Sequence, residues 1–414
     1  MTATFDRVRA TPSSPTGDRQ HVTLVVVLGL LTALGPFTID LYLPALPAIT
    51  QDLHTGESAV QLTLTGTLVG LGVGQLLVGP LSDAVGRRCP LLAGIGLHVA
   101  ASLLCAVSSG VPVLGAFRFL EGLGAAAAAV IAMAVVRDRF TGHTTATVLS
   151  RLILVVGASP ILAPTVGAQL LRWTDWRGIF VGLAVVGAAT ALFAGLALPE
   201  TLPPPLRRAG GLRTTAADYW RLLRDPVYVG LVFVTGLSMA ALFAYVAGSS
   251  FVLQEQFGLT QQQFGVVFAI NAGALIGATQ LNVVLLRRAA PYRILQTALV
   301  AGTVLSVLLL IVTRTGFGGL PAILLLLFLI LAAVGFQNPN ATALALSRHG
   351  EAAGTAASLL GAVQFGVGGL AAPLVGVLGN DAVAMVAVTC MATVAALAVL
   401  FLLVRRPSGT ERHS

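Results

Sequence analysis

Residues 79–92 read GPLSDAVGRRCPLL, and this short polar stretch lies between two long apolar runs. Asp83, Arg87 and Arg88 follow one another closely there, although charged residues make up only 10% of the chain. Arginine pairs next to an apolar run are typical of the cytoplasmic loops of membrane proteins. The stretch therefore predicts a tight connection between two membrane spans.

The composition of the whole chain agrees with this prediction. Of the 414 residues, 56% are hydrophobic, and the mean hydropathy is +0.90. A soluble protein of this length needs far more polar surface. A run of about 20 apolar residues spans a bilayer, and twelve such runs occur, including 22–47 and 226–248. The sequence predicts an all-α membrane protein with twelve transmembrane helices.

One polar interruption divides the chain into two parts. Residues 199–225, PETLPPPLRRAGGLRTTAADYWRLLRD, are rich in Pro and Arg and predict a cytoplasmic linker with a short surface helix at 214–224. The linker separates a six-helix half at 22–198 from a second at 226–404. The tails are residues 1–21 and 405–414. Two such halves with substrate between them are a recurring transporter architecture.

The basic residues are distributed very unevenly. All 24 are arginines. If the N-terminus is cytoplasmic, twenty lie in segments on that side, Arg118 lies inside a span, and only Arg172, Arg177 and Arg314 lie in segments on the other side. This bias predicts that both termini are cytoplasmic and that the chain crosses the cell inner (plasma) membrane. It also accounts for the basic pI without any nucleic-acid partner.

Several other functions are disfavoured by what the sequence lacks. Cys89, Cys105 and Cys390 are scattered without the spacing of a metal site or disulfide framework. No phosphate-binding loop of the G-x-x-x-x-G-K-S/T type occurs, which disfavours ATP as the energy source. No catalytic constellation is evident. We therefore expect no enzymatic activity, no cofactor and no metal.

The 79–92 loop also matches a known pattern. Its G-x-L-x-D-x-x-G-R-R arrangement resembles the signature loop of the major facilitator superfamily, carried here by Gly79, Asp83, Gly86, Arg87 and Arg88. The resemblance implies a charge latch that holds the two halves together on the cytoplasmic side. The alternative is an ordinary cytoplasmic loop with an incidental acid.

Two further segments resemble motifs of the same superfamily. RFLEGLGAAAAA (118–129) is similar to the R-x-x-Q-G segment of its fourth span. GASPILAPTVGA (157–168) resembles the bent fifth helix of its antiporters, although alanine replaces two of the glycines. The resemblance implies a proton-driven exporter, with Gly157, Pro160, Pro164 and Gly167 as the motif residues. Proline also kinks ordinary helices, so a purely structural role stays open.

Other stretches resemble one branch of the superfamily, the Bcr/CflA exporters of bicyclomycin and chloramphenicol resistance. They are GPFTIDLYLPALPAI (35–49), AGSSFVLQEQFGLTQQQFG (247–265) and AAGTAASLLGAVQFGVG (352–368). Residues 247–265 also predict a hairpin between the seventh and eighth spans at the outer face. The resemblance implies a monomeric drug:proton antiporter.

Two acids, Asp40 and Glu121, lie within predicted spans. A charge at the bilayer centre costs about 2.5–3.5 kcal/mol on insertion scales, and such residues are usually functional. Asp40 has no basic neighbour in sequence, and the prolines around it predict a bent first span. A carboxylate that is neutral when dry and charged when wet can carry a proton, and the branch places an acid here. Alternatively, Asp40 caps a helix near the outer interface.

Glu121 stands three positions after Arg118, so the two share a helix face and can pair. A structural ion pair and a role in coupling both remain open. Within the spans, Phe37, Tyr42, Tyr245, Asn271 and Gln364 are candidates to line a cavity, and His98 is most simply a packed residue.

The sequence thus predicts a proton-coupled exporter of small amphipathic compounds, with chloramphenicol-type antibiotics as the best guess. Its partners would be the drug, protons and the lipid bilayer, with Asp40, Arg118 and Glu121 as coupling residues. One alternative is an exporter of an endogenous metabolite such as a sugar, a nucleoside or a self-made antibiotic. The other is a non-transporting receptor, which the presence of Asp40, Asp83 and Arg87 disfavours.

Overall fold

The computed structural model describes residues 15–207, 212–349 and 352–404. Most of the two predicted tails, residues 1–14 and 405–414, lies outside the described parts of the chain. Within those parts, twelve helices are long and apolar enough to cross a membrane. The prediction of an all-α membrane protein with twelve spans is confirmed.

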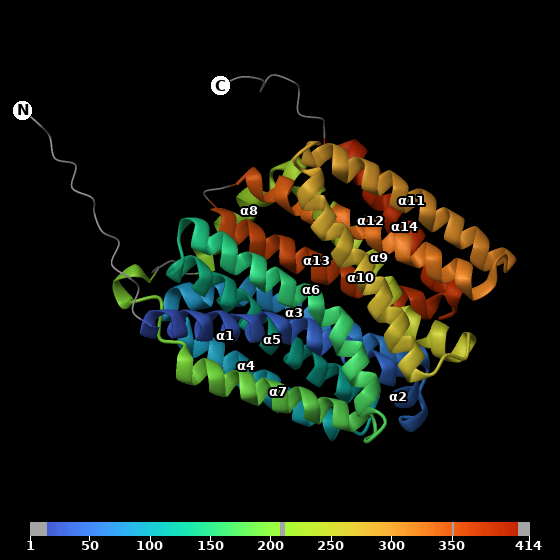
Figure 1. The fold of residues 1–414 in the computed structure, drawn as a ribbon, viewed down its shortest axis with the longest axis horizontal. Coiled ribbons are helices and arrows are strands. Elements are labelled where there is room, and N and C mark those ends of the chain that lie inside the picture. The colour runs from blue at the N-terminus through green and yellow to red at the C-terminus, as the bar shows by residue number, and fades with distance from the viewer. Residues whose placement is uncertain (1–14, 208–211, 350–351, 405–414) are drawn as a thin grey trace, which may run out of the picture.

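The first half holds six of these spans (Figure 1). The first span is built from three pieces, α1 (Pro15–Asp40), the 3₁₀ turn η1 (Leu43–Ala45) and α2 (Leu46–Asp52). The others are α3 (Glu57–Val85), α4 (Arg88–Ala106), α5 (Val111–Arg139), α6 (Gly142–Leu170) and α7 (Trp176–Ala197).

The linker and the second half follow. The linker contains the short turn η2 (Pro204–Leu206) and the helix α8 (Leu212–Leu223). The seventh span is α9 (Pro226–Phe251), which continues into a π-helical turn, η3 (Val252–Gln256). The remaining spans are α10 (Gln261–Leu285), α11 (Pro291–Thr315), α12 (Gly319–Ser347), α13 (Ala353–Val377) and α14 (Ala382–Leu403).

Polar side chains fix where several helices begin. The carboxylates of Asp175, Asp225 and Asp381 accept hydrogen bonds from backbone N–H groups in the first turns of α7, α9 and α14. Thr260 and Gln263 form a reciprocal capping box at the start of α10. Such caps satisfy donors that have no partner inside the helix. These capping residues therefore fix the residues at which α7, α9, α10 and α14 begin.

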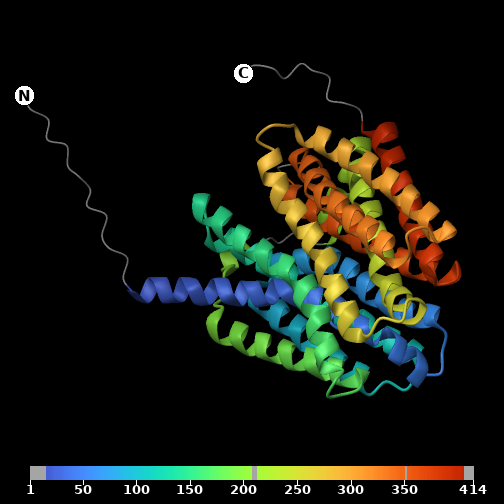
Figure 2. The same cartoon turned by 45° about the vertical axis from the view of Figure 1, so that its right-hand side comes forward.

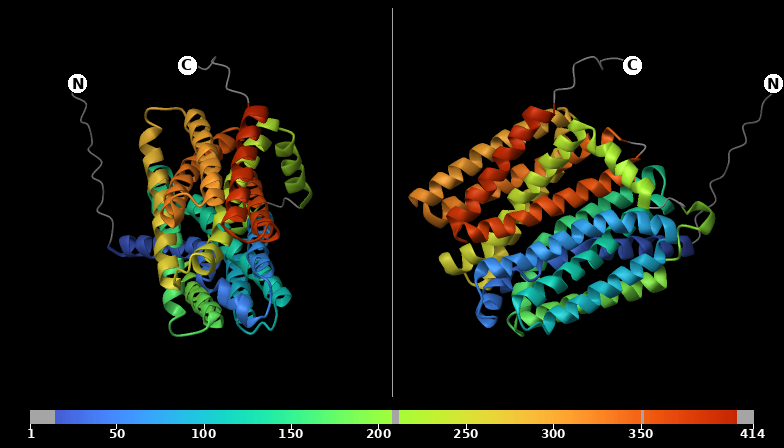
Figure 3. Two further views of the ribbon diagram at one scale, coloured as in Figure 1. Left: turned by 90° about the vertical axis from the view of Figure 1, so that its right-hand side faces the viewer. Right: turned by 180° about the vertical axis from the view of Figure 1, so that it is seen from behind.

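The two halves lie side by side (Figures 1 and 3). We call the side on which α1 begins and α14 ends the termini side, and the opposite side the distal side. The halves contact each other through α3 with α13 and through α6 with α10. In Figure 2, α6 and α10 are adjacent near the distal side and separate toward the termini side.

Within the first half, α3 and α5 pack with their backbones very close together. A Cβ atom at Gly122 would lie only 2.1 Å from the carbonyl oxygen of Thr67, and one at Gly70 would lie 2.1 Å from that of Phe119. Small residues at a contact let membrane helices approach closely and gain dispersion energy. The α3–α5 pair therefore depends on glycine at these two positions.

Hydrogen bonds between the halves gather on the distal side. Ser250 Oγ of α9 donates to the carbonyl oxygen of Leu43 at 2.6 Å, and Gln61 Nε2 of α3 donates to that of Ala247 at 3.2 Å. Thr65 Oγ1 donates to the carbonyl oxygen of Gly369 on α13 at 2.9 Å. This structure is therefore the conformation in which the distal side is closed.

The predicted hairpin at 247–265 differs from the structure. The seventh span continues without a break to Gln256, and only residues 257–260 connect it to α10. The reason is tertiary: Ser250 and Gln254 both donate to carbonyl oxygens of the first span, at Leu43 and Pro44. These contacts hold the end of the span as a helix where the sequence alone predicts a turn.

Candidate functional site

The first span is interrupted directly after Asp40, the last residue of α1. Residues 41–42 form a turn, and η1 and α2 each begin with a proline within their first two positions. Proline removes a backbone donor and cannot continue a regular helix. The break leaves backbone carbonyl groups free to accept hydrogen bonds from the other half, as Leu43 and Pro44 do.

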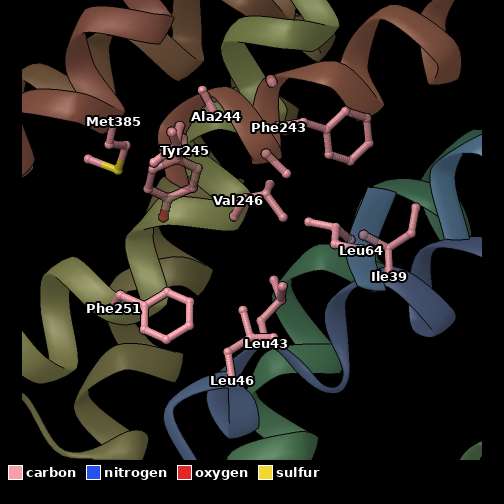
Figure 4. Close-up of a cluster of buried hydrophobic side chains, with 14 of the residues drawn as sticks. Ile39, Leu43, Leu46, Leu64, Phe243, Ala244, Tyr245, Val246, Phe251 and Met385 are labelled. Carbon is pink, nitrogen blue, oxygen red and sulfur yellow. The ribbon is translucent and has the colours of Figure 1, made fainter. Parts of the chain in front are cut away.

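Asp40 is buried at this break, with 6% of its surface exposed. Among the described residues, no hydrogen bond or ion pair reaches its carboxylate. It interacts electrostatically with Tyr245 of α9, which lies in the other half. Figure 4 shows apolar side chains of the first and seventh spans in this region, with Ile39 and Leu43 on the first span and Tyr245, Val246 and Phe251 on the seventh. Asp40 is thus an unpaired carboxylate at the contact between the halves.

Tyr245 is held in place by its own half. Asn271 Nδ2 of α10 donates to the Tyr245 hydroxyl at 3.0 Å, and the Tyr245 ring stacks on Phe268 with their centroids 5.4 Å apart. Both Tyr245 and Asn271 are buried. The Tyr245 phenol is therefore oriented by two residues of α10.

Arg118 and Glu121 form the ion pair that their spacing predicts. Arg118 Nη1 donates to Glu121 Oε2 at 2.5 Å, and Nη2 donates to the backbone carbonyl of Thr38 at 3.0 Å. The guanidinium carbon lies 4.1 Å from the centroid of the Tyr42 ring, a cation–π contact. Both side chains of the ion pair are fully buried. Both terminal nitrogens of Arg118 thus have an acceptor, whereas its buried Nε has no hydrogen-bond partner among the described residues.

His98 of α4 belongs to the same network, although the sequence suggested only a packed residue. The Thr38 hydroxyl donates to the Leu34 carbonyl at 2.7 Å, so it accepts from His98 Nε2 at 2.9 Å. His98 Nε2 also lies 4.0 Å from Glu121 Oε1, which accepts a hydrogen bond from Ser102 at 2.6 Å. A signal existed in the sequence, because His98 and Ser102 are polar residues four apart on an apolar helix. We call Thr38, His98, Ser102, Arg118 and Glu121 the Arg118 network.

The Arg118 network and Asp40 are therefore connected through the first span. Thr38 joins the Arg118 network to α1, two residues before Asp40. The network holds a paired cation and anion, whereas Asp40 has no counter-charge of its own. Of the two acids that the sequence places within the spans, Glu121 therefore has an ion-pair partner and Asp40 has none among the described residues.

The residues predicted to line a cavity fall into two groups. Phe37 and Gln364 are partly exposed, consistent with a position at an accessible surface. Tyr42 and Asn271 do not line an open surface, because both are buried against polar partners. Tyr245 is also buried.

The predicted antiporter motif lies on α6, a continuous helix that contains Pro160 and Pro164. Gly167 packs against the break in the first span, since a Cβ atom there would lie 2.0 Å from the carbonyl oxygen of Leu41. Gly157 faces Ile276 of α10 in the other half. The motif therefore sits between the α1 break and the second half.

The charges of the 79–92 loop make their contacts inside the first half. Arg87 Nη1 donates to Asp83 at 2.5 Å, and its Nε donates to Asp138 of α5 at 3.0 Å. The family resemblance implies that these charges hold the two halves together, but in this conformation they join α3, α4 and α5. Gly79 lies beside Ser358 of α13, in the second half.

Glu200, which sequence analysis did not select, completes this cluster. It accepts backbone hydrogen bonds from Arg87 at 2.8 Å and from Arg88 at 3.2 Å, at the start of α4. Burial opposes the charged form, but these donors outweigh it and lower the pKa of Glu200 below its ordinary value. Gly86 has φ of +102°, and a side chain there would also collide with Glu200. Arg88 additionally donates to the Gly195 carbonyl near the end of α7 at 2.6 Å.

Comparison with known proteins agrees with this architecture. Residues 28–373 match the family model described as Major Facilitator Superfamily. The chain belongs to the major facilitator superfamily. The superfamily resemblance drawn from the 79–92 loop is thereby confirmed, and the chain is a multi-pass membrane transporter rather than an enzyme.

Its relatives in the superfamily include proteins named for drug resistance. The chain is 36% identical to an uncharacterized MFS-type transporter, YdgK, of Bacillus subtilis, over 91% of this chain and 93% of that one. It is 31% identical to a bicyclomycin resistance protein homolog of Haemophilus influenzae, over 87% of this chain and 90% of that one. The crystal structure of a D-xylose-proton symporter has the same fold, with a TM-score of 0.73 at 18% identity over 92% and 97% of the two chains.

Proposed function

We propose that this transporter exports small amphipathic compounds in exchange for protons, with chloramphenicol-type antibiotics as the first substrates to test. The proposal places the termini side in the cytoplasm of a cell with a plasma-membrane pH gradient. The asymmetry of the arginines supports that orientation. The names of the drug-resistance relatives support the substrate class.

The observation that carries the proposal is the buried, unpaired carboxylate of Asp40. It lies at the break of the first span, and its charge acts electrostatically on Tyr245 of the second half. Intramembrane acids are expensive and are usually functional. A carboxylate in this position can exchange its proton for a drug, because both would occupy the contact between the halves.

In the proposed cycle, a drug enters from the cytoplasm and binds when Asp40 has lost its proton. The halves then rock about the 199–225 linker, the distal side opens, and a proton from outside displaces the drug. After the distal side closes, proton release to the cytoplasm resets Asp40. The Arg118–Glu121 ion pair stays intact throughout this cycle. Arg118 positions α1 through its hydrogen bond to the Thr38 carbonyl.

Transport by the purified protein in proteoliposomes under an imposed pH gradient tests the proposal. We expect radiolabelled chloramphenicol or bicyclomycin to accumulate against its gradient with the wild type, and Asp40→Asn to abolish accumulation while leaving downhill exchange. Asp52→Asn is the matched control, since Asp52 is an acid of the same span that pairs with Arg177 on the distal side.

Undiminished uphill accumulation by Asp40→Asn would remove Asp40 from the coupling mechanism. If neither antibiotic is moved by the wild type, the drug assignment is wrong. A screen of sugars and nucleosides under the same gradient would then test export of an endogenous metabolite.

A further inference from the structure

The linker helix α8 lies on the termini side, where it contacts α9 and α13 of the second half (Figure 1). Leu222 is 1% exposed and belongs to the apolar core cluster that includes Tyr228 and Leu231. The Tyr219 hydroxyl donates to the carbonyl oxygen of Leu76 on α3, in the first half, at 3.4 Å. These two contacts fix which face of α8 points away from the protein.

The outward face of α8 combines apolar and basic side chains. Trp220 is 61% exposed and Leu223 is 49% exposed. Arg221 and Arg224 are also exposed, and the guanidinium carbon of Arg224 lies 5.4 Å from the centroid of the Trp220 ring. Leu223 and Arg224 stand three and four positions after Trp220, which places all three on one side of the helix. We call Trp220, Arg221, Leu223 and Arg224 the α8 face.

The positive charge of the α8 face is not neutralised by the protein itself. Among the described residues, neither Arg221 nor Arg224 forms an ion pair. Asp225, directly after Arg224, pairs with Arg348 and caps α9. Asp218 lies two positions before Trp220, on the other side of the helix. The face therefore presents two positive charges without a counter-charge, beside exposed apolar side chains.

The chain places the α8 face close to the membrane surface. Only Arg224 and Asp225 separate α8 from Pro226, where the seventh span begins. The residues between Trp220 and Pro226 can cover at most about 15 Å. Tryptophan is enriched at membrane–water interfaces, and exposed Trp and Leu beside arginine are typical of helices that lie in the interface. The position and the composition of the face both indicate contact with lipid headgroups.

We propose that the α8 face binds the headgroup of an anionic phospholipid in the leaflet on the termini side. Arg221 and Arg224 contact the phosphate, and Trp220 and Leu223 lie at the boundary between headgroups and acyl chains. Charge complementarity selects the lipid, because each basic residue at an anionic surface favours an anionic over a neutral lipid by up to about fivefold. The inference goes beyond the proposed transport function and does not rest on it.

Quenching of tryptophan fluorescence by brominated lipids tests this proposal. The full-length parent protein carries Trp173→Phe and Trp176→Phe, which leaves Trp220 as its one tryptophan. It is placed in phosphatidylcholine nanodiscs that contain increasing fractions of brominated phosphatidylglycerol or brominated phosphatidylcholine. Bromine quenches a tryptophan that lies close to it. We expect the anionic lipid to half-quench Trp220 at a several-fold lower fraction than the neutral one.

A second parent protein, which retains Trp176, guards against a folding defect from that substitution. Trp176 is 2% exposed and donates to Asp52 on the distal side. It should therefore add a constant signal, and the difference between the two brominated lipids should remain.

Substitutions of the two arginines test the headgroup contact directly. Arg221→Gln with Arg224→Gln should remove the preference, so that both lipids quench at equal fractions. Arg221→Lys with Arg224→Lys should retain most of it, because both positive charges remain. Arg287→Gln with Arg288→Gln is the matched control and should keep it, since these exposed arginines lie on the same side, in the connection between α10 and α11. Added salt should weaken the preference of the parent.

The proposal is wrong if neither brominated lipid quenches Trp220, because the α8 face would then lie in water. It is also wrong if the parent shows no preference for the anionic lipid, or if the double glutamine variant keeps that preference. Inorganic phosphate at matched ionic strength should not compete, and loss of the preference in phosphate would assign the site to a soluble anion instead. The measurement uses no drug and no gradient, so a failure of drug transport would leave its result unchanged.

Discussion

At the scale of single residues, Arg118 and Glu121 place two opposite charges inside one membrane span. Both side chains are fully buried, and their hydrogen bonds end on Thr38 and Ser102. Removing one partner of a buried ion pair typically costs about 3–5 kcal/mol, since the other charge is left uncompensated. Loss of either side chain should therefore lower the stability of the protein substantially.

We predict that Glu121→Ala lowers the thermal unfolding midpoint of the purified protein strongly, whereas Glu121→Gln lowers it less because the amide still accepts from Arg118. Asp52→Ala, which removes the exposed pair with Arg177, should change the midpoint little. Unfolding in detergent, followed by tryptophan fluorescence, measures all three. Equal effects of Glu121→Ala and Asp52→Ala would contradict the structural role assigned to the buried pair.

At the scale of helices, the α3–α5 contact depends on the absence of a side chain. We predict that Gly122→Ala destabilises the protein by about 1–3 kcal/mol or more, because its methyl group would overlap the Thr67 carbonyl. Gly115→Ala on the same helix is the control, since nothing lies within 4 Å of its Cβ position. Alanine is the better helix former by about 1 kcal/mol, so Gly115→Ala should be neutral or stabilising. The yield of monodisperse protein and the unfolding midpoint report the difference.

The helices also show what can be read from sequence. The twelve spans and the Arg118–Glu121 pair were predicted because hydrophobic length and spacing along one helix are local properties. The contacts of His98 with Thr38, and of Asn380 with Glu57, join segments 60 and 323 positions apart. Which helices meet is decided by packing of the whole chain, so their polar partners could not be predicted. The extension of the seventh span to Gln256 was missed for the same reason.

At the scale of the whole molecule, the two halves should move relative to each other during transport. Cβ atoms at Ala168 of α6 and Gly265 of α10 would lie 3.6 Å apart, and disulfides have Cβ atoms about 3.5–4.5 Å apart. We predict that Ala168→Cys with Gly265→Cys, in a Cys89→Ser background, forms a disulfide that fixes the distal side closed. Oxidation should then stop chloramphenicol transport in proteoliposomes, and reductant should restore it.

The single variant Ala168→Cys is the control for this cross-link, and oxidant should leave its transport rate unchanged. The cross-linked fraction is measured by mass spectrometry of the digested protein. Full transport by completely cross-linked protein would mean that α6 and α10 do not separate at this point during the cycle.

The contacts between the halves are unequal on the two flanks of the molecule. On one flank, α3 follows α13 from Ser58 beside Gly376 to Gly79 beside Ser358. On the other, α6 and α10 touch near the distal side and then diverge (Figure 2). In a bilayer, the diverging flank faces the acyl chains of one leaflet. A lipophilic compound dissolved in that leaflet would reach the contact sideways, so its partition into lipid, more than its aqueous concentration, would govern how readily it is captured.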